Sequence, residues 1–122
     1  MYLRDKLPEV TPVISPIDEV SKCLLLAAQI IRKRGWCQLS LEGENGERCL
    51  RGAILEAKYG ERPTAVRNPN DYPEMNRVSS YLGMPTRENG NSGYYYIVNW
   101  NNASGRTAAE VIAALESAAL HN

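Results

Sequence analysis

The sequence has little of the chemistry that enzymes and metal sites commonly use. Its only histidine is His121, next to the C-terminus, and its three cysteines, Cys23, Cys37 and Cys49, form an odd set without a CxxC spacing. A zinc site and a histidine-assisted cysteine or serine nucleophile therefore lack their usual parts. We expect no metal and no cofactor, and free thiols that serve mainly as small apolar side chains in a reducing compartment.

The sequence also lacks an excess of charge and a long hydrophobic run. Its 14 Lys and Arg residues balance 14 Asp and Glu residues, whereas a nucleic-acid-binding domain is commonly basic. The longest apolar run, residues 24–28, is too short to cross a bilayer, and residues 1–10 lack the apolar core of a signal peptide. We therefore expect a cytoplasmic protein with no membrane partner, and we do not expect nucleic acid as its main partner.

The chain is long enough for one domain with its own core. It has 122 residues, of which 43% are hydrophobic, and a chain of this size can bury a core without disulfides or metal. Residues 1–14 contain Pro8 and Pro12 and no sustained periodicity. We predict an extended N-terminal arm over 1–14 and a single globular domain over 15–122.

Four segments have the apolar spacing of amphipathic helices. Ser15 and Asp18 form a capping box before a stripe that runs from Ile17 to Ile31 and stops at Gly35. A second stripe ends at Gly60, although residues 47–52 could be strand or helix. Asn70 or Asp71 can cap a third helix that ends at Gly83, and Thr107 with Glu110 forms a capping box before an alanine-rich last helix, which should pack closely on another helix.

The remaining segments indicate a small amount of β-structure. Residues 36–42 have an extended pattern and are followed by a turn at 43–46 that contains an Asn-Gly pair. Residues 85–93 form a polar loop, and residues 94–100 are aromatic and β-prone, which is typical of a strand. The predicted fold is mainly α (α+β), with about four helices and a two- or three-stranded β element.

Three short motifs together resemble a known family. They are the run from Arg34 to Gln38, the run from Cys49 through Ile54, and the run from Trp100 to Thr107. In this order and spacing they look like a family of small actinobacterial and bacteriophage proteins of unknown function, over residues 20–120. The resemblance implies no activity, substrate or cofactor. Family members often have Asp where this chain has Asn102, so an obligatory carboxylate at that position is not expected.

Two cysteines are the candidates for a catalytic role. Cys37 follows a helix stop, and Cys49 lies in the first turn of a predicted helix with Arg48 and Arg51 beside it. A helix N-terminus or a nearby cation can lower the pKa of a thiol. With no internal histidine, however, the base would have to be Asp or Glu, so an enzyme is not the favoured interpretation.

The candidate binding residues are aromatic, amide and arginine side chains. In structural terms they can fold onto the core, satisfy turns or cap the last helix. In functional terms they can stack on a ligand, donate to an anion at a helix N-terminus, or contact a protein. The set comprises Trp36, Gln38, Tyr94, Tyr96, Trp100, Asn101 and Arg106.

These observations favour a non-enzymatic binding protein. Its partner is expected to be a protein or a second copy of the chain, with a small anionic or nucleotide ligand as a further possibility. If the protein is phage-encoded, as the family resemblance allows, the expected role is inhibition of a host defence system by binding a protein or a nucleotide signal. The alternatives are a cysteine-dependent enzyme and a weak nucleic-acid-binding accessory protein that uses the arginines, with Arg32–Arg34 among them.

Overall fold

Five α-helices and one short 3-10 helix make up the described part of the protein. The computed structural model describes residues 18–84 and 91–121. Its elements are α1 (Glu19–Arg34), α2 (Leu50–Tyr59), η1 (Pro63–Ala65), α3 (Tyr72–Tyr81), α4 (Asn91–Asn101) and α5 (Ala108–Leu120). Within these ranges β-structure is limited to two isolated bridges, Trp36–Arg48 and Glu42–Arg48. The predicted α+β class is therefore wrong, and the fold is all-α.

The largest difference from the prediction is α4, where a strand was expected over 94–100. The tyrosines, Ile97 and Val98 have high β-propensity, but propensity yields to burial in tertiary structure. As a helix, the segment places Ile97 fully in the core and directs Asn101, one turn later, into a buried position. Residues 91–93, expected in the polar loop, belong to this helix, and residues 85–90 lie outside the described part.

Residues 36–48 form a folded-back loop in place of a strand pair. The predicted turn is present, since the Gly46 N–H donates to the Gly43 carbonyl at 3.1 Å and the Gly43 N–H donates to the Glu47 carbonyl at 2.9 Å. A ladder does not extend from this turn because residues 38 and 39 make their hydrogen bonds with the end of α4. The β-pairing between the arms of the loop is limited to the two isolated bridges.

Helix α1 begins later than predicted, and α2 begins within the range 47–52 that the sequence left open. Asp18, not Ser15, caps α1, because its carboxylate accepts from the Ser21 N–H at 2.7 Å; Ser15 and the predicted arm over 1–14 lie outside the described residues. The ambiguity at 47–52 is resolved, because α2 starts at Leu50 and Cys49 is its N-cap. The predicted stops at Gly35 and Gly60 are both confirmed, with φ of 93° and 72°.

The last predicted capping box is confirmed, whereas the cap of α3 is of another kind. Thr107 accepts from the Glu110 N–H, and Glu110 accepts from the Thr107 N–H. Asp71 occupies the N-cap position of α3 without a side-chain cap bond. Its carboxylate instead accepts from Arg51 at 2.7 Å, which ties α3 to α2.

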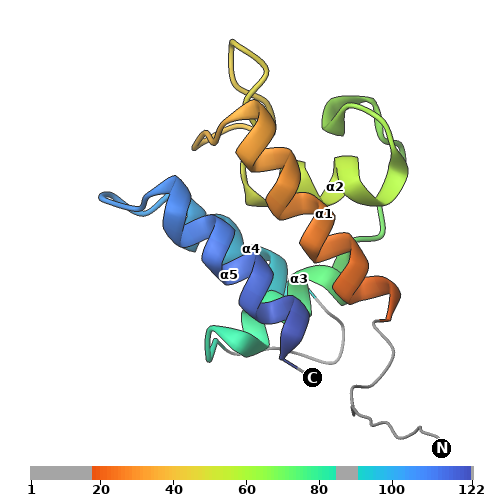
Figure 1. The fold of residues 1–122 in the computed structure, drawn as a ribbon, viewed down its shortest axis with the longest axis vertical. Coiled ribbons are helices and arrows are strands. Elements are labelled where there is room, and N and C mark those ends of the chain that lie inside the picture. The colour runs from red at the N-terminus through yellow and green to blue at the C-terminus, as the bar shows by residue number, and fades with distance from the viewer. Residues whose placement is uncertain (1–17, 85–90, 122) are drawn as a thin grey trace, which may run out of the picture.

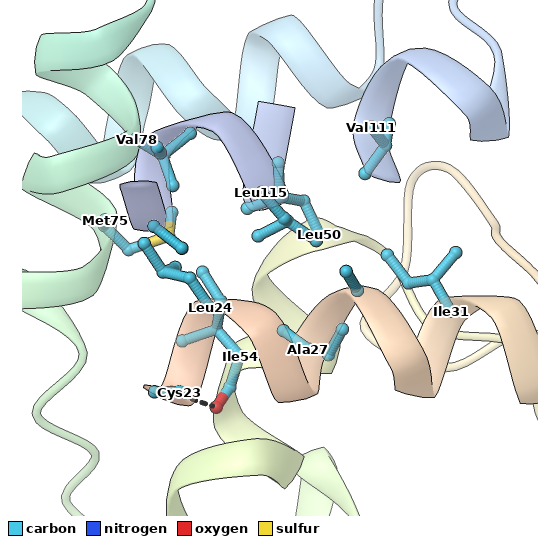
Figure 2. Packing of buried hydrophobic residues seen from close by; sticks show 14 of the residues in the cluster. Cys23, Leu24, Ala27, Ile31, Leu50, Ile54, Met75, Val78, Val111 and Leu115 are labelled. Atoms are coloured by element: carbon cyan, nitrogen blue, oxygen red, sulfur yellow. Dashed lines mark hydrogen bonds between the residues drawn. The ribbon is translucent and has the colours of Figure 1, made fainter. Parts of the chain in front are cut away.

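The core lies where α1 packs between α5 and α2, with α3 and α4 closing the other side. Figure 1 shows α1 and α5 side by side and running in opposite directions. Small side chains permit this approach, since Ala118 and Ala119 are buried and the Ser21 hydroxyl donates to the Ala119 carbonyl. Figure 2 shows Leu24, Ile54 and other apolar side chains from different helices converging on one space. The helices thus form one frame that holds the 36–48 loop against α2 and α4.

Candidate functional site: a pocket and an exposed leucine at the end of α4

Asn101 is the centre of a hydrogen-bond network that fastens the 36–48 loop to two helices. Its Oδ1 accepts from the Trp36 indole Nε1–H at 2.7 Å and from the Leu50 N–H, the first residue of α2, at 3.1 Å. Its Nδ2 donates to the carbonyl of Cys37 at 3.3 Å and to Asn102 Oδ1 at 3.1 Å. Because Asn101 is only 3% exposed, these bonds replace water for its side-chain amide.

The neighbouring side chains Gln38 and Asn102 extend this network. We call the group formed by Trp36, Gln38, Asn101 and Asn102 the junction. Gln38 Nε2 donates to the carbonyls of Asn101 and Ala103, at 3.1 and 2.9 Å. These carbonyls belong to the last residue of α4 and to the turn that follows it, where intrahelical partners run out. Asn102 Oδ1 accepts from the Leu39 N–H at 2.8 Å. Since Asn102 serves here through an acceptor oxygen, a carboxylate oxygen could make the same two bonds without any metal.

The junction holds Leu39 in an unusual position. Its φ is 70°, in the left-handed region that a bulky side chain rarely adopts, and its side chain is 83% exposed. Strained backbone of this kind persists only where the surroundings fix it, and it is concentrated at functional sites. The bonds of Gln38 and Asn102 supply that fixation, so the protein holds an apolar side chain out into solvent.

A buried ion pair supports the other arm of the loop. Arg48 is 3% exposed, and its Nε donates to Glu56 at 2.9 Å while its Nη1 donates to the Gly46 carbonyl at 2.8 Å. Glu42 accepts from the Thr64 hydroxyl at 2.6 Å and from Arg62 at 2.8 Å. Those bonds lower the pKa of Glu42 to about 2. The loop is therefore anchored at both ends and at its middle.

A pocket of about 260 Å³ opens beside Leu39. One wall is a stripe on α4, formed by Tyr94, Ile97, Val98 and Asn101, which follow the i, i+3, i+4, i+7 spacing of one helix face. The other wall consists of loop and α2 residues, namely Leu39, Ser40, Leu41, Cys49 and Arg51, with Asn102 at the end. The lining is mainly apolar with a few polar groups, as is typical of ligand sites.

Arg51 is the one charged residue of this lining, and its charge is already compensated. Its Nε donates to Asp71, which is 1% exposed, at 2.7 Å. Its guanidinium carbon also lies 4.6 Å from the centre of the Tyr94 ring. The pocket is therefore mainly apolar, and the charge of Arg51 in its lining is compensated by Asp71.

The other predicted binding residues lie apart from this pocket. The Arg106 guanidinium stacks 4.0 Å from the Trp100 ring centre and donates from Nε to the Trp100 carbonyl at 3.0 Å. Because the capping box uses the N–H groups of Thr107 and Glu110, few donors at this end of α5 are left for an anion. Tyr96 contacts Tyr95 edge-to-face on α4, with the ring centroids 5.7 Å apart.

The three thiols are held in their neutral form. Burial raises the pKa of Cys37 to about 11 and that of Cys23 to about 12. Burial also raises the pKa of Cys49, although its Sγ accepts from the Gly52 N–H at 3.2 Å as the cap of α2. In this geometry Cys49 acts as a helix cap, and neither Cys37 nor Cys49 has the lowered pKa of an activated nucleophile.

Among residues 18–84 and 91–121, no group of three or more His, Cys, Asp or Glu side chains is placed to hold a metal ion. In the same ranges no helix has the length and apolar character to cross a bilayer.

The pocket contains residues that the sequence prediction missed. Leu39, Leu41, Ile97 and Val98 were not among the candidates. The spacing of Tyr94, Ile97, Val98 and Asn101 was a usable signal, but it is visible only if the segment is considered as a helix. The exposure of Leu39 has no signal in the sequence, because it depends on hydrogen bonds made by residues more than sixty positions away.

Comparison with known proteins gives one match. No curated protein and no solved structure matches the chain. A family profile described as a family of unknown function (DUF6197) matches residues 15–121. These residues include every part of the junction and of the pocket. The chain therefore belongs to the DUF6197 family of unknown function.

Proposed function

We propose that this protein is a non-enzymatic binding module that contacts a protein partner through Leu39 and takes an apolar side chain of that partner into the adjoining pocket. The observation that carries the proposal is Leu39 itself, which is 83% exposed at a φ of 70°. Holding an apolar side chain in water costs free energy, as does the strained backbone, and the junction around Asn101 maintains both.

The surroundings of Leu39 suit a protein partner. Tyr94 and Tyr95 on α4 are 38% and 62% exposed, and tyrosine is enriched in protein interfaces. A buried apolar anchor that fills a pocket is the usual centre of binding energy in such interfaces. The pocket provides the recess for an anchor, and the leucine provides a second contact at its rim.

The alternatives find less support in the geometry. An anion or nucleotide at the start of α5 would compete with the stacking of Arg106 and with the capping box. A cysteine-dependent enzyme would need a thiol of lowered pKa, whereas the pKa values of Cys37 and Cys49 are raised. The narrower hypothesis of a phage-encoded inhibitor of host defence stays a prediction, and it requires a binding face of this kind.

The test uses amino-acid amides as probes of the pocket. N-acetyl-leucinamide and N-acetyl-tryptophanamide are titrated into the methyl-labelled Leu39→Gly variant, in which the exposed leucine of the rim is removed and the other lining residues of the pocket are kept. We expect saturable shifts of the Ile97 and Val98 methyl signals. In a Leu39→Gly/Val98→Arg double variant, which no longer has the Val98 methyl groups, the shift of the Ile97 methyl signals should be lost. Leu120→Arg, which adds the same charge at an exposed position outside the pocket, is the matched control and should leave the shifts unchanged. No shift with either probe, or equal shifts with Val98→Arg, would refute the proposal.

A further inference from the structure

The proposed binding face carries a projecting side chain directly beside a recess. What we infer from this arrangement about the identity of the partner rests on the proposed function. The projecting side chain and the recess are adjacent, because Leu39 is itself part of the pocket rim. When a projection and a recess lie side by side on one surface, a two-fold rotation about an axis between them brings each projection onto the opposite recess. The face is then complementary to itself.

The recess is suited to a leucine in size. A cavity of about 150 Å³ lined by apolar side chains can hold a benzene molecule, and the pocket here measures about 260 Å³. Its α4 wall presents Val98, with the fully buried Ile97 behind it, and its loop wall presents Leu41. A leucine entering between these walls would meet apolar surface on both sides.

The electrostatics favour an uncharged occupant from an identical chain. Arg51 is engaged by Asp71 and Tyr94, and Asn101 has partners for both its oxygen and its nitrogen. An entering leucine therefore strips water from no unpaired charge. With 14 positive and 14 negative residues, two copies of the chain also have no net repulsion to overcome.

We propose that two copies of this chain associate about a two-fold axis, with Leu39 of each copy seated in the pocket of the other. The strained backbone of Leu39 fits this role, because a rigid projection loses little conformational freedom when it docks. Tyr94 and Tyr95 lie on the same helix as the pocket wall and extend the contact beyond the leucine. The site is thus an interface between copies, in which each subunit contributes a residue to the other's pocket.

The experiment is sedimentation analysis between about 1 μM and 1 mM chain, using wild type, Leu39→Gly and Val98→Arg. Wild type should form a dimer, and each variant alone should raise the dissociation constant by about a hundredfold or more, since both leucine contacts are lost. Leu120→Gly, which removes an exposed leucine outside the pocket, should dimerise like wild type. Glycine tolerates the φ of residue 39, so thermal unfolding of Leu39→Gly should show an intact fold.

Mixing the two variants provides the decisive measurement. Leu39→Gly keeps the pocket, and Val98→Arg keeps the leucine, so a mixed pair restores one of the two contacts. We expect a heterodimer that is at least about tenfold tighter than either variant alone and weaker than wild type. A mixture no tighter than its components, or a wild-type chain that stays monomeric at 1 mM, would overturn the inference. If the chain is monomeric but the amide probes still bind the pocket, the proposed function stands and only the identity of the partner is wrong.

Discussion

Replacing Asn101 with alanine should remove a large part of the free energy of unfolding. The substitution leaves the Trp36 indole N–H and the Leu50 backbone N–H without their acceptor. An unpaired buried donor costs about 1–3 kcal/mol, so the two together should cost about 2–5 kcal/mol when partial access of water to the indole is allowed for. Against a typical total of about 5–15 kcal/mol, such a loss is readily measured by urea unfolding followed by far-UV circular dichroism.

A double-mutant cycle separates the network from general damage to the helix. Trp36→Phe removes one donor to Asn101, so its combination with Asn101→Ala should cost about 1–2 kcal/mol less than the sum of the single changes. Asn99→Ala is the matched control, since Asn99 is exposed on the same helix, and should stay within about 0.5 kcal/mol of wild type. A loss below about 1 kcal/mol for Asn101→Ala, or a cycle without coupling, would refute the central role of this side chain.

Three further predictions concern the surroundings of the junction. Gly52→Ala should destabilise the fold by about 2 kcal/mol or more in urea unfolding, because its new Cβ would collide with the Leu41 carbonyl oxygen; wild-type stability would contradict this. Because bonds from Thr64 and other groups lower the pKa of Glu42 to about 2, the free energy of unfolding should be level above about pH 5 and fall as the pH drops toward 2. That fall should be shallower in Glu42→Gln, and an unchanged slope would exclude Glu42 as its source. With a pKa of about 11, Cys37 in the folded chain should react with iodoacetamide at pH 8 about a hundredfold more slowly than in urea, and equal rates measured by mass spectrometry would show that the thiol is not protected.

The helix ends that depend on local chemistry could be predicted from the sequence. Gly35, Gly60 and the Thr107–Glu110 capping box act within a few residues of their own positions, so their signals are complete in a short window. The predicted cap at Asp71 was correct in its position and wrong in its bonding. Asp71 occupies the N-cap position of α3, but its carboxylate pairs with Arg51 on another helix. Long-range pairing of that kind leaves no local pattern.

The strand prediction at 94–100 failed for a related reason. A run of tyrosine, isoleucine and valine is compatible with either structure, and the choice depends on which residues must reach the core together. In the protein, Ile97 and Asn101 are both buried on one helix face, and the burial of Asn101 is possible only because the distant Trp36 and Leu50 supply donors. The structure places Trp36, Gln38 and Asn101 together beside the pocket, and their role as binding residues stays a prediction. Leu39 and Val98 were not among the predicted residues.

The hydrogen bonds that hold residue 39 have a consequence for variation among related chains. Asn102 binds the N–H of Leu39, and Gln38 binds carbonyls of α4, so none of these contacts uses the Leu39 side chain. The scaffold therefore fixes the backbone at this position without using the side chain, so residues that tolerate a positive φ, such as glycine and asparagine, can replace leucine there. A substitution at position 39 would therefore change the contact made with the proposed partner while the backbone of the loop and the fold stay the same.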